Sequence, residues 1–247
     1  MTDHFSLDGK VALVTGGSRG LGREMVLAFA AAGADVVITS RKLDACESLA
    51  REVEALGRRA LPVSCHVGHW DEIESLVERA YDKFGKVDIL VNNAGMSPVA
   101  PSSAETSEEL FDKVIAINFK GPFRLTSLVG ERMAAGDGGS IINISSSGAL
   151  FPQPRFGPYA GAKAALNTLT GVFAREYGPK VRVNTLSAGP FLTDISKHWD
   201  EEKRHTTRSA AGRPGQPEEI ITTALYLASS ASSYTTSSLI RVDGGLY

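Results

Sequence analysis

The chain has 247 residues, of which 43% are hydrophobic and 22% are charged, the composition of an ordinary globular protein with enough apolar material for a core. With 26 Lys and Arg against 28 Asp and Glu, its formal net charge is -2, so no overall basic field favours nucleic acid or an anionic membrane. We therefore expect small molecules and copies of the chain itself as partners.

Targeting signals and cysteine usage favour the cytoplasm. The N-terminus has no basic segment followed by an apolar run, and no later stretch is long and apolar enough to span a bilayer. Cys46 and Cys65 are the two thiols of the chain, which fits a reducing compartment without a disulfide framework. We expect cytoplasmic residence and no membrane partner.

Strand-like and helix-like segments alternate along the chain, which is typical of a parallel sheet covered by helices. Strands are predicted at residues 10–15, 35–39, 60–64, 88–91, 140–144, 181–186 and 238–242. Helices are predicted at residues 21–32, 43–56, 70–84, 106–133, 158–177 and 217–228.

No linker or repeat interrupts this order, so one doubly wound α/β domain spanning residues 1–247 is the economical interpretation. Residues 189–215 are the irregular part, and they carry Phe191, Leu192, Ile195 and Trp199 among charged residues. A long excursion of this kind is either a surface loop or a lid. We predict a substrate flap here.

A glycine-rich turn joins the first strand to the first helix. It reads Thr15-Gly16-Gly17-Ser18-Arg19-Gly20-Leu21-Gly22. Glycines in this context let backbone N–H groups approach a pyrophosphate at a helix N-terminus. The turn therefore predicts a dinucleotide site, with Gly20 and Gly22 leaving room for the phosphates and for close helix packing.

The end of the second strand indicates which dinucleotide is bound. Sites that prefer NAD usually place an Asp or Glu there to hold the ribose hydroxyls, whereas this chain reads Thr39-Ser40-Arg41-Lys42. Arg19 and Arg41 could pair with a 2′-phosphate. We predict NADP(H), with NAD(H) possible; the alternative is that Arg41 and Lys42 only begin a solvated helix.

Tyr159 and Lys163 are four residues apart on a predicted helix, and Ser146 lies thirteen residues before the tyrosine. This spacing puts the phenol and the ammonium on the same helix face. A cation beside a tyrosine lowers its pKa from the ordinary value of ~10, which suits general acid–base work. The alternative is a half-buried aromatic beside a solvated amine.

The segment Cys65-His66-Val67-Gly68-His69 raises the question of a metal. A structural zinc normally needs four ligands, and no second Cys/His pair follows at a matching distance. We predict no metal site, and interpret the segment as a strand end that enters a loop.

Taken together, these motifs resemble the short-chain dehydrogenase/reductase family over almost the whole chain. The resemblance rests on the glycine turn, on Asn92-Asn93-Ala94-Gly95, and on Asn118, Ser146, Tyr159-x-x-x-Lys163 and Asn184, in the order and at the spacings of the family. It implies a Rossmann-like sheet of about seven strands. It also implies assembly as a homotetramer or homodimer, and hydride transfer between a nicotinamide and a carbonyl or alcohol.

The resemblance implies a role for each of four catalytic residues. Tyr159 would exchange the proton of the substrate oxygen, Ser146 would orient and polarise that oxygen, and Lys163 would lower the pKa of the tyrosine and hold the nicotinamide ribose. The carbonyl of Asn118 would hold a water that relays protons. Pro122 has no N–H to bond the Asn118 carbonyl, so this carbonyl is left free. The alternative is that Pro122 only kinks the helix, and the two interpretations are compatible.

The cofactor contacts implied by the resemblance extend over several loops. They are Gly16, Ser18, Arg19, Gly20, Leu21, Gly22, Ser40, Arg41, His66, Val67, Asn93, Ala94, Gly95, Tyr159, Lys163, Gly189, Phe191 and Thr193. The chain departs from the family pattern where His66 replaces an Asp that often contacts adenine, where Ala188 replaces a proline, and where Ser237 replaces a glycine. The first departure puts side-chain recognition of adenine in doubt.

We therefore expect an NADP(H)-dependent alcohol dehydrogenase or carbonyl reductase. The walls of its substrate pocket would come from residues 96–99, 148–156 and the flap, which carry no clustered arginines, so a neutral ketone or a 3-oxoacyl thioester is favoured over a charged sugar acid. A non-catalytic NADP-binding scaffold or sensor is one alternative. Epimerase or dehydratase chemistry on a bound cofactor is another.

Overall fold

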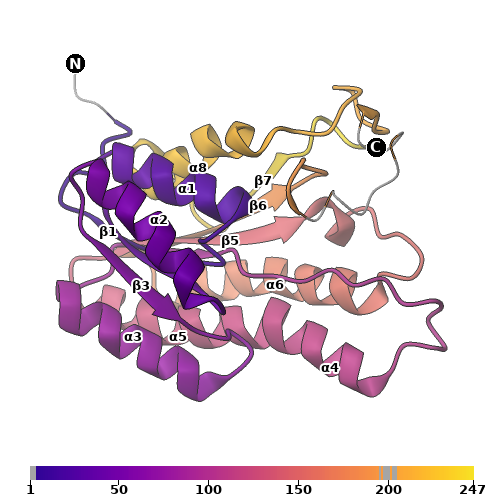
Figure 1. Ribbon diagram of the computed structural model, residues 1–247, viewed down its shortest axis with the longest axis horizontal. Helices are drawn as coiled ribbons and strands as arrows, with labels where there is room; N and C mark the ends of the chain where they lie inside the picture. The colour runs from indigo at the N-terminus through magenta and orange to yellow at the C-terminus, as the bar shows by residue number, and fades with distance from the viewer. Residues whose placement is uncertain (1–3, 195, 197–200, 202–204) are drawn as a thin grey trace.

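The computed structural model describes residues 4–194, 196, 201 and 205–247. Its strands form one parallel sheet in the order β3-β2-β1-β4-β5-β6-β7 (Figure 1). They are β1 (Val11–Thr15), β2 (Asp35–Ser40), β3 (Ala60–Ser64), β4 (Ile89–Asn92), β5 (Gly139–Ser146), β6 (Val181–Ala188) and β7 (Leu239–Val242). The seven-stranded Rossmann-like sheet predicted from the sequence is confirmed.

Helices cover both faces of the sheet (Figure 1). One face carries α1 (Gly20–Ala31), α2 (Leu43–Ala55) and α8 (Ile221–Ala228); the other carries α3 (Trp70–Phe84), α4 (Glu108–Ile115), α5 (Gly121–Ala135) and α6 (Gly157–Glu176). Short helical turns are η1 (Ala116–Lys120), η2 (Ser147–Ala149), η4 (Pro217–Ile220) and η5 (Ser230–Ser232). Among the residues described, no helix is long and apolar enough to cross a membrane.

The unbroken apolar run of β1 is explained by burial on both faces. Ala12 and Val14 point into the core under α1, whereas Val11 and Leu13 point into the core under α3 and α5. A strand between two helical layers has no solvent-facing side and so needs no polar alternation. β1, which lies between β2 and β4 in the sheet, is therefore a rigid support for the glycine turn that follows it.

The long helix predicted over residues 106–133 is wrong in its middle. The structure divides it into α4, a π-helical turn η1 and α5. Pro122 has no N–H and its ring crowds the carbonyl four residues earlier, so the α-helical pattern cannot continue; instead the N–H of Gly121 bonds the carbonyl of Ala116, five residues back. The π-helical turn that interrupts the α-helix contains Asn118.

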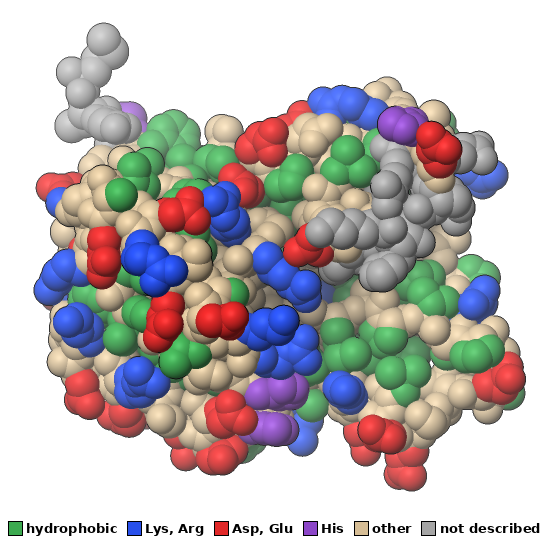
Figure 2. Space-filling view, in the orientation of Figure 1, with side chains coloured by type: hydrophobic (Ala, Val, Ile, Leu, Met, Phe, Trp, Pro, Cys, Tyr) green, Lys and Arg blue, Asp and Glu red, His purple; other side chains and the backbone are tan. Residues whose placement is uncertain are grey.

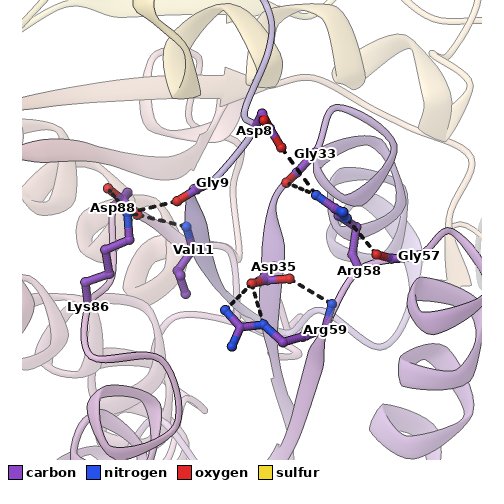
Figure 3. Close-up of polar contacts among 10 residues, drawn as sticks. All are labelled: Asp8, Gly9, Val11, Gly33, Asp35, Gly57, Arg58, Arg59, Lys86 and Asp88. Carbon is purple, nitrogen blue, oxygen red and sulfur yellow. Dashed lines mark hydrogen bonds and ion pairs between the residues drawn. The ribbon is translucent and has the colours of Figure 1, made fainter.

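Ion pairs and hydrogen bonds of two aspartates lie at the amino ends of the central strands (Figure 3). Asp88 accepts a hydrogen bond from the N–H of Val11 at 2.9 Å and pairs with Lys86 at 2.9 Å. Asp35 pairs with Arg59 across β2 and β3 at 2.5 Å. The open loops lie at the opposite, carboxyl edge, where ligands bind in sheets of this type.

Candidate active site

The glycine turn after β1 forms a cradle in which several positions favour glycine. Gly16 and Gly20 have φ of 61° and 53°, values that favour glycine. A Cβ on Gly22 would lie 2.2 Å from the carbonyl oxygen of Gly16. Backbone conformation or close packing therefore favours glycine at each of these three positions, and no side chain at them covers the backbone of the turn.

The N-terminus of α1, beside the glycine turn, is not capped by a side chain of its N-cap residue. Its N-cap residue, Arg19, makes no side-chain cap hydrogen bond, and the first turn carries no acidic residue. The first N–H groups of the helix therefore face outward with the positive end of the helix dipole. Ser18 is half-buried beside this end, and Leu21 packs against the core below it.

One hydroxyl joins the cradle to the loop after β4. Thr15 Oγ1 accepts hydrogen bonds from the N–H groups of Asn93 and Ala94, each at 3.0 Å, and donates to the carbonyl of Val91 at 3.2 Å. The Asn93 amide donates back to the carbonyls of Thr15 and Gly16 at 2.8 and 3.1 Å. The two loops at the centre of the carboxyl edge therefore form one unit.

The end of β2 presents cations and no carboxylate. Ser40 Oγ accepts from the N–H of Lys42 at 3.3 Å and contacts Cys46 Sγ at 3.2 Å, which fixes the turn. Arg41 is exposed, and its guanidinium has no hydrogen bond or ion pair to the part of the chain that the structure describes. Arg19 is exposed as well, and pairs with Asp194 at 3.8 Å. Figure 2 shows Lys, Arg and His side chains gathered on this face.

His66 stacks on His69 with 4.4 Å between the ring centroids. Its Nδ1 accepts a hydrogen bond from the N–H of Gly68 at 3.2 Å, so the neutral ring carries its proton on Nε2. Burial, His69 and Arg41 lower the pKa of His66, although Glu72 opposes this. At neutral pH the residue is an uncharged flat ring where the family often has a carboxylate.

Val67, next in this loop, lies against the first residue of α5. A Cβ on Gly121 would lie 2.0 Å from the carbonyl oxygen of Val67, so only glycine fits there. The thiol of Cys65 is buried, which raises its pKa to about 12. Within the described ranges no group of three His, Cys, Asp or Glu side chains is placed to hold a metal ion.

Ser146 and Tyr159 meet where β5 ends and α6 begins. Ser146 Oγ accepts a hydrogen bond from the N–H of Gly148 at 3.0 Å. A Cβ on Gly148 would lie 3.3 Å from Ser146 Oγ and 3.7 Å from Tyr159 Cε1. The Ser146 hydroxyl and the Tyr159 ring therefore both lie against Gly148.

The pKa of Tyr159 differs from the sequence-based expectation. Burial raises it, and the hydrogen bond from Ser146 lowers it only in part. Lys163, expected to lower this pKa, is not among the groups that shift it; instead Lys163 Nζ donates to the carbonyl of Ile144 at 2.8 Å. The lysine is 4% exposed, and burial lowers its own pKa to about 8.

Asn118 uses its side chain to hold the loop after β4. Its Nδ2 donates to the carbonyls of Met96 and Val114, both at 2.9 Å, and its Oδ1 accepts from the N–H of Met96 at 3.3 Å. A Cβ on Gly95 would lie 2.9 Å from Asn118 Oδ1 and 3.6 Å from Lys163 Nζ. Gly95 therefore lies against both Asn118 and Lys163.

A buried polar chain beneath the site was missed by sequence reasoning. Asn92 donates to Asn143 at 2.8 Å, Asn143 donates to Thr170 at 3.0 Å, and Thr170 bonds Thr185 at 2.7 Å. It links β4, β5, α6 and β6. The one available signal was the polar residues Asn143 and Thr185 within otherwise apolar strand runs. Asn184, part of the family resemblance, instead anchors the carbonyl of Thr235.

The predicted flap is described in part. Gly189 packs against the backbone of Asp243, where a Cβ would lie 2.5 Å from its Cα. The ring of Phe191 is buried in the core against Gly215, so the prediction that this side chain lines the substrate pocket is wrong, and its backbone is the part left for a cofactor. Ile195 and Trp199 lie outside the described residues.

Two cavities adjoin these residues. A cleft of about 960 Å³ lies between Gly20 at the start of α1 and Leu192, Thr193 and Asp194 of the flap. A narrow cavity of about 10 Å³, room for about one water molecule, adjoins Tyr159. Its walls are the apolar Pro98, Ala100, Leu110, Val114 and Pro158, together with Thr106, Arg155 and Tyr159.

The carboxyl edge as a whole fits a nicotinamide dinucleotide. The bare cradle and open helix N-terminus suit a pyrophosphate. The guanidinium of Arg41, which has no partner among the described residues, suits a further anionic group. Ser146, Tyr159 and Lys163 lie at the same edge, after β5 and on α6. The arrangement can bind a dinucleotide and exchange a proton with an oxygen atom placed beside it.

Comparison with known proteins agrees with this geometry. Residues 16–247 match the family model described as enoyl-(acyl carrier protein) reductase. The 3-oxoacyl-(acyl-carrier-protein) reductase FabG of Thermotoga maritima is 37% identical over 97% of this chain and 98% of that protein.

Two solved structures superpose closely on the fold. The structure of 7 alpha-hydroxysteroid dehydrogenase complexed with NADH and 7-oxo glycochenodeoxycholic acid is similar with a TM-score of 0.95 and 34% identity, over 100% of this chain and 98% of that one. A gluconate 5-dehydrogenase from Burkholderia cenocepacia, in complex with NADP and tartrate, gives a TM-score of 0.92 and 32% identity, over 99% and 97%.

Proposed function

Because the chain belongs to the short-chain dehydrogenase/reductase family and is a nicotinamide-dependent oxidoreductase acting on CH–OH or carbonyl groups, we propose that it interconverts a ketone and a secondary alcohol with NADP(H). The observation that carries the proposal is the convergence of Ser146 and Tyr159 at the sheet edge that also bears the anion cradle. The nicotinamide, when bound, supplies or accepts the hydride.

The preference for NADP(H) rests on the charges at the end of β2. The guanidinium of Arg41 has no partner among the described residues, and Arg19 at the start of α1 is a second cation. No carboxylate stands at the strand end to repel a 2′-phosphate. NADP bound to the Burkholderia cenocepacia enzyme supports this choice. NADH bound to the hydroxysteroid dehydrogenase keeps NAD(H) as a weaker alternative.

Tyr159 is proposed to act as the general acid toward a ketone and as the base toward an alcohol. Its raised pKa keeps the phenol protonated at neutral pH, the form that donates a proton to a carbonyl oxygen. Ser146, held by Gly148, donates a second hydrogen bond to the same oxygen. The proton lost by Tyr159 would be replaced through Lys163 and a water held at the carbonyl of Asn118.

A direct assay tests this proposal. The purified protein is mixed with NADPH and a panel of ketones and 3-oxoacyl thioesters, and the absorbance of the reduced cofactor is followed. Turnover with NADPH at least about tenfold better than with NADH supports the proposal. Tight cofactor binding without turnover across the panel would favour a scaffold or sensor, and product formation without net cofactor oxidation would favour an epimerase or dehydratase.

Thioester reduction is supported by the similarity to the 3-oxoacyl-(acyl-carrier-protein) reductase. Assembly as a homotetramer or homodimer, residence in the cytoplasm and a flap role for residues 189–215 stay predictions. Size-exclusion chromatography with light scattering tests the first of them.

A further inference from the structure

Arg155 has an unusual backbone conformation beside the proposed active site. Its φ is 73°, and among the described non-glycine residues only Ser237 shares a positive value. A side chain with a Cβ is disfavoured in this left-handed region. A conformation of this kind persists where surrounding contacts enforce it, and such residues gather at ligand sites.

A hydrogen bond to a distant loop holds the side chain. Arg155 Nε donates to the carbonyl of Ala100 at 2.9 Å, across 55 residues of sequence. Ala100 belongs to the segment after β4, whereas Arg155 lies between η2 and α6. The bond therefore ties two walls of the cavity beside Tyr159 and fixes the plane of the guanidinium.

Most N–H donors of the Arg155 guanidinium have no hydrogen-bond acceptor among the described residues. Among the described residues, Arg155 makes no ion pair and no hydrogen bond other than the one to Ala100, so Nη1 and Nη2 have no protein partner. Arg155 is also the one charged residue lining the cavity that contains Tyr159, and the other lining residues are uncharged. A guanidinium fork with free donors matches a carboxylate in a bidentate manner.

We infer that Arg155 binds a carboxylate of the substrate whose carbonyl or alcohol oxygen lies at Tyr159. This inference rests on the proposed oxidoreductase function and gives it a substrate class: an oxo acid or a hydroxy acid. A single guanidinium suits a monovalent carboxylate better than a phosphate dianion, which calls for further donors. It differs from the sequence-based expectation of a neutral ketone or a 3-oxoacyl thioester, which rested on the lack of clustered arginines.

Paired substrates test the inference. Oxo acids with the ketone two, three or four methylenes from the carboxylate are compared with their primary amides, using NADPH and the full chain. We expect kcat/KM of the best acid to exceed that of its amide by about tenfold or more. Equal values for acid and amide at every chain length would overturn the inference while leaving the oxidoreductase function intact.

Variants of Arg155 separate charge from structure. Arg155→Asn keeps a residue type that tolerates the left-handed conformation and removes the charge, so it should lose about tenfold or more on the acid and less than about threefold on the amide. Arg155→Lys should recover part of the loss. Arg51→Gln, at an exposed position of α2, is the matched control and should change neither. Equal losses on acid and amide in Arg155→Asn would assign the residue a structural role only.

Binding gives a second readout that needs no turnover. The same acids and amides are titrated calorimetrically into the NADP-loaded protein. Tighter binding of the acid in the wild type, lost in Arg155→Asn, supports the inference even if no ketone is reduced. If the wild type binds both alike, the inference fails, whatever the outcome of the oxidoreductase assay.

Discussion

Lys163 donates a hydrogen bond from Nζ to the main-chain carbonyl of Ile144 at 2.8 Å. This bond ties α6 to β5 just before Ser146, and leaves the ammonium buried without a carboxylate partner among the described residues. An unpaired buried cation is costly. The site thus carries an unfavourable charge in the protein without cofactor.

The first prediction concerns pH and stability. The pKa of Lys163 is lowered from 10.5 to about 8, so between these values the unfolded chain binds more protons and folding becomes more favourable as pH rises. The change corresponds to at most about 3 kcal/mol. We expect the free energy of unfolding of the wild type, relative to Lys163→Met, to rise from pH 8 to 10.5 by up to this amount.

Urea unfolding of both cofactor-free proteins at several pH values measures this difference. Other titrating groups are common to the two proteins and cancel. A difference that does not change with pH would show that the lysine titrates in the folded protein as it does in the unfolded chain.

The second prediction is that Tyr159→Phe lowers kcat by about 100-fold to 10,000-fold, since a positioned general acid contributes about this much. NADPH affinity should change less than about threefold. Tyr177→Phe is the matched control: Tyr177 caps the far end of α6 and should keep wild-type turnover. Steady-state kinetics and a fluorescence titration of NADPH measure the two quantities, and near-normal turnover in Tyr159→Phe would refute the proposed mechanism.

The third prediction is that Arg41→Ala weakens NADPH binding by about tenfold or more and NADH binding by less than about threefold. The reason is loss of a charge-assisted bond to the 2′-phosphate. Arg51→Ala, on the adjacent helix α2, controls for a general change in surface charge. Isothermal titration measures both cofactors; equal losses for the two would disprove the assignment of Arg41.

The fourth prediction contrasts two glycines. In Gly22→Ala the new methyl would meet the carbonyl oxygen of Gly16 at 2.2 Å, so the cradle must shift, and we expect both lower stability and weaker binding of NADPH. In Gly161→Ala no heavy atom lies within 4 Å of the new methyl. That variant should gain about 0.5 to 1 kcal/mol from helix propensity.

Thermal unfolding with and without NADPH compares the two variants. Unchanged cofactor binding in Gly22→Ala would show that the cradle tolerates a side chain. Loss of stability in Gly161→Ala would contradict the open surroundings of that position.

The fifth prediction concerns the polar chain beneath the site. Thr170→Val leaves Asn143 Nδ2 and Thr185 Oγ1 without their partner in the core, which costs about 1 to 3 kcal/mol. Thr168→Val, at an exposed position of the same helix, should change stability by less than about 0.5 kcal/mol. Urea unfolding compares them, and equal effects would show that the buried chain adds nothing.

The sequence predicts the sheet because strands buried on both faces, such as β1, leave an unbroken apolar run. It also predicts the cradle, since Gly16, Gly20 and Gly22 are required locally by the turn. Pro122 indicates that the helix is disturbed at Asn118. The close approach of the Val67 carbonyl to Gly121 comes from tertiary packing and could not be predicted.

Side-chain direction and burial could not be predicted. The amide of Asn118 bonds Met96, the ammonium of Lys163 bonds Ile144, and the pKa of Tyr159 is raised; each depends on what the fold brings nearby. Arg155 is the clearest case, because nothing in its sequence neighbourhood indicates a positive φ or a bond to Ala100.

The hydroxyl of Thr15 has a consequence for the energetics of cofactor binding. By bonding Asn93 and Ala94, it orders the loops after β1 and β4 when the chain folds. Conformational entropy that a flexible loop would lose on binding is then already lost. The Thr15 hydroxyl thus preorganises the two loops for the cofactor before the cofactor binds.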